Sequence, residues 1–304
     1  MSFDKQTFFS PGKLLISSEY FVLDGALALA VPTKLGQEMT VETIEDGNSI
    51  IEWRAFHESK YWFSILFNSL DFSVISTDNV AAANFILKVF EKLKILNLQF
   101  FKNKNSFVVE TNLQFPANYG LGSSSTLMNN LANWVGVCPF TLNSLSLGGS
   151  GYDIAVAQEN SAILYKNLPE ISFEKICYNP TFANQLILIH LNTKQDSREG
   201  IQLYKSKILD RQKILEFSNL TQSIIQADTI EAFSEYMELH ERTISEYLEI
   251  KTVKESYFSD CPVFVKSLGA WGGDFVLSMK FEGYKTYFLE KGFSDIWQWK
   301  DLVV

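Results

Sequence analysis

The sequence predicts a globular α+β protein built from two domains. Its 304 residues are 46% hydrophobic and 14% aromatic, which is enough to fill two cores of ordinary domain size. Strand-like and helix-like segments are mixed along both halves and do not alternate strictly, as they would in a doubly wound sheet. The sequence pattern changes between residues 167 and 179, after which a strand is followed by charged helical segments. We therefore expect an N-terminal domain over 1–170 and a C-terminal domain over 171–304. No Pro- or Ser-rich linker separates them, and a cleft between two such domains is the default ligand site.

In the first half, apolar runs of strand length alternate with turn residues. They predict strands at residues 13–18, 26–31, 38–44, 49–56 and 106–111. Pro11-Gly12 predicts a turn before the first of them. Residues 76–97 have helical spacing of apolar side chains, with Ser76, Thr77 or Asp78 as the N-cap. A second helix is expected from Ser123 to Gly136.

In the second half, residues 184–192 predict a strand, and two charged helical segments follow at Glu199–Gln226 and Asp228–Leu248. The second segment begins with a D-x-x-E pattern that resembles a capping box. Residues 263–281 then read as strand, glycine-rich turn and strand, and residues 285–293 as a helix.

Composition and charge exclude several classes of function. A net charge of −9 disfavours a general nucleic-acid binder, because neutralising phosphates requires clustered Lys and Arg. The N-terminus lacks a basic segment followed by an apolar one, and no apolar run approaches the roughly 20 residues that span a bilayer. We therefore expect a cytoplasmic protein without membrane contact, as a monomer or homodimer. The three cysteines are widely spaced and form no CxxC, which indicates neither disulfides nor a zinc site.

The stretch "GLGSSST" carries the first candidate site. Two glycines, Gly120 and Gly122, flank Leu121 and precede the hydroxyls of Ser123, Ser124 and Ser125 at the start of the expected helix. An ordinary glycine turn with one serine N-cap is sufficient to explain the motif by itself. The motif is neither a Walker A loop nor a Rossmann fingerprint. However, no Asp, Glu, Lys, Arg or His occurs between Glu110 and Asp153. A neutral helix with several hydroxyls at its N-terminus favours a bound anion.

Asp153 ends that neutral run and follows the glycine-rich "GGSGY". An Asp at this place is readily explained as a helix N-cap. A single carboxylate at the end of a long uncharged stretch also suits a base that accepts a hydroxyl proton. Both interpretations stay open on the residues alone.

Weaker signals lie elsewhere in the chain. Lys13 follows Pro11-Gly12, and Glu19 lies in a Ser-Ser-Glu-Tyr turn. The glycine-rich segment of residues 269–274 reads as a hairpin turn. Residues 193–200 place Lys194, Ser197 and Arg198 after a strand, as a solvated helix start or an anion-binding loop.

The histidines His57, His190 and His240 lie outside every glycine motif, and no G-x-S-x-G is present. A serine hydrolase and a zinc enzyme are therefore poor fits.

Taken in order, "PGKLLISSEYFVLDGALALAV", "GLGSSS", "GSGYDIA" and "GAWGGDF" resemble the motifs of the GHMP small-molecule kinases. The likeness spans residues 11–275 and is greatest to the mevalonate and phosphomevalonate kinases, and to a bacterial branch named for the GYDIA signature. It implies a nucleotide-binding N-terminal domain, a ferredoxin-like C-terminal domain, and an acceptor between them. It also implies ATP and Mg²⁺ as cofactors, a small hydroxy-acid or phospho-acid as substrate, and a place in isoprenoid biosynthesis by the mevalonate pathway.

The resemblance also assigns residues. It implies that the loop around the ATP phosphates consists of Gly120, Leu121, Gly122, Ser123, Ser124 and Ser125. It implies that Asp153 is the catalytic aspartate and Lys13 its companion near the phosphates. Ser124 and Glu19 are the candidate metal ligands. The third-motif loop contains Gly269, Ala270, Gly272, Gly273 and Asp274.

Three departures from the family pattern matter. No acidic residue lies between Ser123 and Tyr152, where many relatives place a Mg²⁺ ligand. Ser18 replaces a common glycine, and Trp271 replaces a small residue, which predicts a narrowed acceptor pocket. The missing carboxylate leaves a second hypothesis open, namely a nucleotide- or metabolite-binding protein of the same fold without phosphotransfer activity.

Overall fold

The computed structural model describes residues 4–193, 197–269 and 271–304. The chain forms two compact units, and each combines separate stretches of sequence. The first contains the residues up to Gly12 together with Leu35–Ala117 and Gly122–Gln158. The second contains Lys13–Lys34, Asn118–Leu121 and Glu159–Val304. The last stretch of the second unit begins at Glu159, so residue 170 lies inside this unit. Two long strands near the N-terminus contribute residues to both units.

The first unit is built on a mixed sheet. Its strands are β1 (Asp4–Leu15), β2 (Ala28–Ile44), β3 (Ile50–His57), β4 (Lys60–Asn68), β5 (Val74–Thr77) and β6 (Ser106–Leu113). The order is β5-β4-β3-β6-β2, with β1 paired to β2. β3 and β6 run parallel, and the β2–β6, β3–β4 and β4–β5 pairs are antiparallel.

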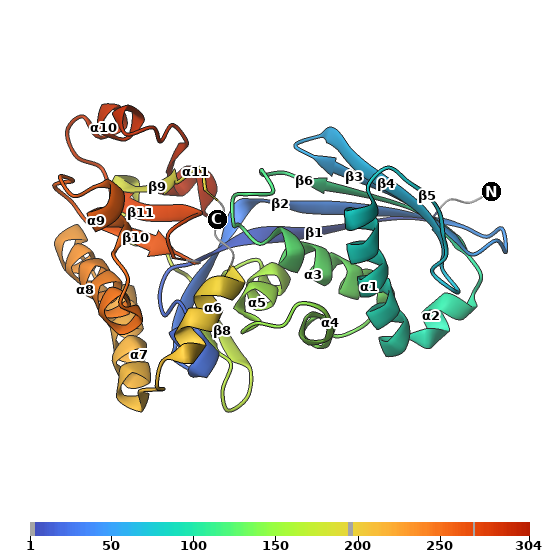
Figure 1. Cartoon of the computed structure of the whole chain (residues 1–304), viewed down its shortest axis with the longest axis horizontal. Helices are drawn as coiled ribbons and strands as arrows, with labels where there is room; N and C mark the ends of the chain where they lie inside the picture. Colours follow the sequence, from blue (N-terminus) through green and yellow to red (C-terminus); the bar gives the residue numbers. More distant parts are fainter. Residues whose placement is uncertain (1–3, 194–196, 270) are drawn as a thin grey trace. The chain divides into compact units, whose positions relative to one another are not determined.

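Helices of the same unit gather on one side of this sheet, as Figure 1 shows for α1 and α3. They are α1 (Val80–Leu96), α2 (Leu98–Lys102), α3 (Ser123–Val135), α4 (Pro139–Ser146) and α5 (Tyr152–Glu159). Their apolar sides and the strands share one core, in which Trp53, Phe90 and Leu131 are almost fully buried. Helix α1 is capped by the Asn79 side chain, which accepts from the Ala82 N–H, so the predicted caps at residues 76–78 were wrong.

The Pro11-Gly12 turn was also predicted wrongly, since both residues lie inside β1. Pairing with β2 overrides the local turn preference of this dipeptide. Gly36 on β2 is suited to the close approach, because a Cβ there would lie 2.3 Å from the Ser10 carbonyl oxygen.

The second unit contains two groups of strands. The start of β2 pairs with β7 (Ala162–Lys166), which pairs with β8 (Ser172–Ile176). A separate antiparallel sheet has the order β10-β11-β9-β12, formed by β9 (Leu186–His190), β10 (Val265–Leu268), β11 (Phe275–Met279) and β12 (Ile296–Gln298). The strand, glycine turn and strand predicted for residues 263–281 are confirmed as β10 and β11.

Six α-helices and two short 3-10 helices complete the described part of this unit. They are η1 (Phe21–Asp24), η2 (Ala183–Gln185), α6 (Ser197–Ser206), α7 (Arg211–Gln226), α8 (Ile230–Leu248), α9 (Val253–Tyr257), α10 (Tyr284–Glu290) and α11 (Trp299–Leu302). Helices α7 and α8 lie side by side, and α8 contacts β10 (Figure 1). The segment predicted as one helix from Glu199 to Gln226 is two, because Asp210 caps a new helix with its side chain.

Candidate active site

In the first unit, the candidate functional feature is the N-terminus of α3. Gly122 adopts the left-handed conformation at its N-cap (φ 90°), and no side chain caps the helix. Ser125 is buried, and its hydroxyl donates to the Gly122 carbonyl oxygen at 2.8 Å. Ser124 is exposed in the same turn. The first N–H groups of a helix have no acceptor within it, so this end presents backbone donors and the Ser124 hydroxyl to an anion.

The body of α3 is neutral and held by amide hydrogen bonds. The Asn130 side chain accepts from the Ser10 hydroxyl at 2.7 Å and donates to the Gln37 carbonyl oxygen at 2.9 Å. Asn129 donates to the Ser10 hydroxyl at 2.9 Å. Both asparagines are almost fully buried. Polar side chains thus fix the helix against β1 and β2 without adding charge beside its N-terminus.

Asp153 lies in the first turn of α5 and is half-buried. Its Oδ1 accepts from the N–H of Ile154 at 3.0 Å. The helix itself begins one residue earlier, at Tyr152, so Asp153 is not the N-cap residue. The next four residues of this helix are buried, so the Asp153 carboxylate is attached to a rigid element.

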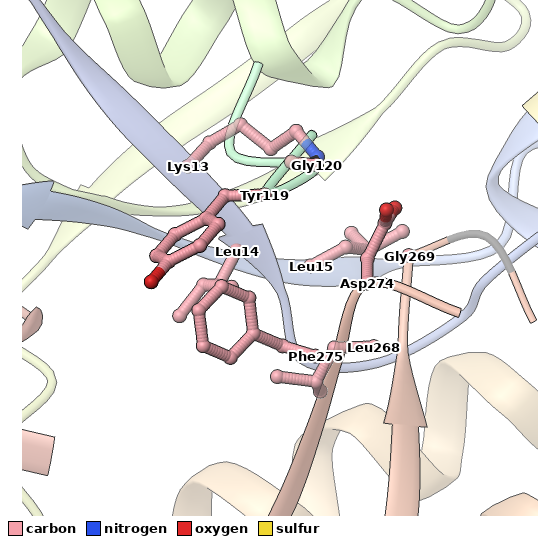
Figure 2. A pocket seen from close by; sticks show the side chains of 9 residues that line it. All are labelled: Lys13, Leu14, Leu15, Tyr119, Gly120, Leu268, Gly269, Asp274 and Phe275. Atoms are coloured by element: carbon pink, nitrogen blue, oxygen red, sulfur yellow. Dashed lines mark hydrogen bonds between the residues drawn. The ribbon is translucent and has the colours of Figure 1, made fainter. Parts of the chain in front are cut away.

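In the second unit, a pocket lies around Lys13 and Gly120 (Figure 2). The Lys13 ammonium donates to the Gly120 carbonyl oxygen at 2.7 Å, and the Lys13 N–H donates to the Leu121 carbonyl oxygen at 2.9 Å. These two bonds join the end of β1 to the glycine loop. Lys13 and Gly120 line a small pocket together with Tyr119, Gly269 and Asp274.

Tyr119 anchors the chain just before Gly120. Its ring stacks on His190 with a centroid separation of 4.3 Å and meets Phe275 edge-on at 5.3 Å. Its hydroxyl donates to the Asp295 carboxylate at 2.7 Å. The glycine loop therefore starts from a residue that is fixed against the four-stranded sheet.

The third-motif loop reaches Gly120 through Asp274. A Cβ added to Gly120 would lie 2.2 Å from Cγ of Asp274 and 2.7 Å from its Cβ. Asp274 has a left-handed backbone (φ 56°), fixed by hydrogen bonds to Thr193 and Leu191, both of 2.8 Å. Only a residue without a side chain fits at Gly120, and the Asp274 carboxyl group covers it.

Glu19 lies in a fully buried cluster instead of in this pocket. Its Oε1 is 2.5 Å from the Lys266 ammonium, and its Oε2 is 3.2 Å from Nε2 of His240. Burial raises the pKa of Glu19, and Lys266 opposes that rise. The neighbouring Ser18 has φ 64°, which explains why a glycine suits this position. Because the carboxylate is fully buried and paired with Lys266, Glu19 is poorly placed to bind a metal ion.

Trp271 packs away from the pocket. It is 4% exposed and belongs to a core with Tyr20, Phe21, Tyr204 and Phe217, so it does not line the pocket of Lys13 and Gly120. That it changes or narrows the acceptor pocket stays a prediction. Its backbone N–H donates to the Tyr20 hydroxyl at 3.1 Å. The buried Trp271 ring anchors the third-motif loop to this aromatic core.

The remaining predicted residues fall in three places. Ser197 and Arg198 begin α6, where Arg198 is exposed. Gly272 and Gly273 lie in the turn between β10 and β11. Lys194 and Ala270 lie outside the described residues.

Among the described residues, no group of three or more His, Cys, Asp or Glu side chains could hold a metal ion. Along the same residues, no helix combines the length and apolar character needed to cross a bilayer.

Comparisons with known proteins define the fold. No protein-family model matches the chain, and no curated protein matches it either. The chain has the two-domain fold of the GHMP kinases, seen in many solved structures. A mevalonate kinase aligns with TM-score 0.68 and 18% identity over 96% of this chain and 98% of its own. The phosphomevalonate kinase of Streptococcus pneumoniae aligns with TM-score 0.64 and 18% identity, over 96% and 98%. The galactokinase of Lactococcus lactis aligns with TM-score 0.66 and 13% identity, over 99% and 93%. The comparisons do not resolve a branch within this group.

Proposed function

We propose that the chain is an ATP-dependent kinase that transfers the γ-phosphoryl group to a hydroxyl or a phosphate of a small acid. The observation that carries this proposal is the N-terminus of α3. There, an exposed Ser124 and the first backbone N–H groups of the helix, which have no acceptor within it, follow two left-handed glycines. The fold supports it, because a similar structure of Streptococcus pneumoniae phosphomevalonate kinase contains phosphomevalonate and AMPPNP.

ATP fits the glycine loop in chemistry. Gly120–Ser125 offers N–H groups and a helix dipole to the phosphates, and the chain from Thr111 to Tyr152, which includes α3, contains no carboxylate that would repel them. The Lys13 ammonium supplies one positive charge at the start of the loop. In phosphoryl transfer most of the catalysis comes from positioning and from such charge stabilisation.

Asp153 acts as the base in this proposal. It orients the acceptor hydroxyl and takes its proton as the oxygen attacks the γ-phosphorus. Its place on the first turn of α5 holds the carboxylate on a rigid element. For an acceptor phosphate, the same residue orients the attacking oxygen.

Mg²⁺ fits the site only as a companion of ATP. Mg²⁺ keeps several waters and is commonly bound by substrate phosphates with one or two protein oxygens, so no cage of carboxylates is required. The exposed Ser124 hydroxyl is the first candidate for a protein oxygen, with Asp153 as the second. Bound there, the ion would neutralise charge on the phosphates. Glu19 is not part of this assignment, because its carboxylate is buried against Lys266 and His240.

Mevalonate and phosphomevalonate are the first acceptors to test, which would place the chain in the mevalonate pathway of isoprenoid biosynthesis. The "GGD" of Gly272–Asp274 favours the phosphomevalonate side. Sugars are included because galactokinase shares the fold.

The test is ADP release in a coupled assay with mevalonate, phosphomevalonate, homoserine and sugars, with and without Mg²⁺. Asp153→Asn keeps the shape of the side chain but removes the base, so turnover should fall by about a hundredfold or more. Asp301→Asn is the matched control, since Asp301 lies exposed in the first turn of α11. Turnover that survives in Asp153→Asn would remove this residue from the mechanism.

A second candidate is a nucleotide- or metabolite-binding protein without transfer activity. It is favoured by the lack of an acidic residue between Ser123 and Tyr152 and by the lack of an acidic metal cluster among the described residues. ATP binding that does not require Mg²⁺, without turnover on any acceptor, would support it over the kinase.

A further inference from the structure

Four ionisable side chains are buried together next to the third-motif loop. Glu19, His240, Glu241 and Lys266 are each at most 3% exposed. They come from the turn after β1, from α8 and from β10, and Glu19 and Lys266 are 247 residues apart in the chain. Buried charges are costly unless they are paired, so a cluster of this kind is a specific feature and not a by-product of folding.

Two members of the cluster, Lys266 and Glu241, bond to the backbone that leads into the loop. The Lys266 ammonium donates to the Ser267 carbonyl oxygen at 2.8 Å as well as to Glu19. Glu241 accepts from the Ser267 N–H at 3.1 Å and from its hydroxyl at 2.9 Å. Ser267, two residues before Gly269, is thus held at its carbonyl oxygen, its N–H and its hydroxyl.

Gly269 is the link to the pocket, because it lines the same pocket as Lys13, Gly120 and Asp274. The strand β10 ends at Leu268, and the loop then departs with a left-handed Gly269 (φ 72°). The hydrogen bonds at Ser267 hold the backbone two residues before this point.

We propose that Lys266, held by its ion pair with Glu19, is a positioning residue that sets the third-motif loop through the Ser267 carbonyl oxygen, and that Glu241 sets the same loop through the Ser267 N–H and hydroxyl. This inference rests on the proposed function only in what the loop is for. The positioning itself concerns atoms within the second unit.

The protons of the cluster are distributed as follows. The Ser18 N–H donates to Nε2 of His240 at 2.8 Å, which places the ring proton on Nδ1 and leaves the histidine neutral. Burial and Lys266 both lower the pKa of His240, in agreement. One ion pair, Glu19 with Lys266, then remains, and an ionised Glu241 would add an unbalanced buried charge.

Glu241 therefore makes the loop sensitive to pH. Burial raises its pKa to about 7, and the charged groups that act on it are Lys266 and Glu19. When protonated, Glu241 donates to the Ser267 hydroxyl. When ionised, it competes with Glu19 for the charge of Lys266 and weakens the bond from Lys266 to the Ser267 carbonyl oxygen.

The experiment measures amide hydrogen exchange of residues 265–275 in the full chain. Glu19→Gln/Lys266→Met removes both charges at similar side-chain size, so no lone buried charge is left. Lys213→Met/Glu216→Gln is the matched control, because it removes a surface ion pair of 2.9 Å. We expect the cluster variant to speed exchange in this segment by about tenfold while β9 stays protected, and the control to change neither. Equal protection in both variants would overturn the proposal.

A second measurement does not depend on how well the cluster variant folds. In the wild-type chain, exchange of residues 265–275, corrected for its intrinsic pH dependence, should be faster at about pH 8 than at about pH 6. Glu241→Gln should remove that difference. A pH-independent wild type, or a Glu241→Gln variant with the wild-type profile, would overturn the role of Glu241.

The failure of this inference and that of the proposed function are distinguishable. If the wild type releases no ADP with any acceptor, the kinase proposal fails while the exchange experiment still decides the positioning. If the wild type is active, the cluster variant should raise KM for ATP by about tenfold with a smaller change in kcat. An unchanged KM together with unchanged exchange would refute the positioning alone.

Discussion

Replacing Gly120 with alanine tests the close contact between the glycine loop and the third-motif loop. Gly120 has φ 68°, and an added Cβ would meet Asp274 Cγ at 2.2 Å and Cβ at 2.7 Å. The overlap cannot be relieved by rotating the carboxyl group alone, because the Asp274 Cβ is itself too close. The Asp274 backbone is fixed by two hydrogen bonds, so the Gly120 loop has to move.

The expected cost has two parts. A side chain in the left-handed region costs about 1–2 kcal/mol. Forcing one extra carbon into a closely packed contact costs about 1–3 kcal/mol more. Gly136 separates the two, since it has φ 71° and nothing within 4 Å of an added Cβ. Gly136→Ala should therefore show only the first part.

The assay is urea unfolding of both variants, combined with the affinity for Mg²⁺-AMPPNP. Gly120→Ala should lose more stability than Gly136→Ala and should bind the nucleotide about tenfold more weakly, which corresponds to about 1.4 kcal/mol. The double variant Gly120→Ala/Asp274→Gly should recover most of the second part of the stability loss. If Gly120→Ala matched Gly136→Ala in both stability and affinity, the contact with Asp274 would not shape the loop.

Three further predictions concern stability. Glu241→Gln should remove a contribution that is fully present below pH 4.5 and lost as the pH rises through about 7, so the stability difference from wild type should change by roughly 2–3 kcal/mol between pH 5 and pH 8 in urea titrations. Trp271→Ala should cost about 3–5 kcal/mol in the same assay, because its ring is 4% exposed in an aromatic core, and a loss below about 1 kcal/mol would contradict that packing. Asn130→Asp replaces the donor to the Gln37 carbonyl oxygen with an acceptor, so the melting temperature should fall by an amount that corresponds to about 2 kcal/mol or more, whereas an unchanged value would show that this bond is dispensable.

Local signals in the sequence predicted the elements that carry the glycine loop. Glycines before a serine run located the start of α3 at Ser123, and Gly136 located its end, where it takes the left-handed C-cap conformation. The strand, glycine turn and strand around residues 269–274 were predicted for the same reason, since turn chemistry and alternation are local properties.

Features that depend on distant residues were not predictable from the sequence. Pro11-Gly12 looks like a turn by itself, and only pairing with β2 makes it part of a strand. Lys266 gave no signal, because its partner Glu19 is 247 residues away and the two meet only in the folded chain. Trp271 was interpreted as a pocket residue because the sequence does not tell which side of a loop a side chain takes.

The most direct test of the account is to incubate the chain with ATP, Mg²⁺ and each acceptor in turn, and to detect the phosphorylated acceptor by mass spectrometry. The account predicts that one small acid, with mevalonate and phosphomevalonate first, gains one phosphoryl group as ADP forms, and that Asp153→Asn loses this reaction by about a hundredfold or more. ATP that binds but leaves every acceptor unphosphorylated would contradict the kinase proposal and favour a binding protein of the same fold.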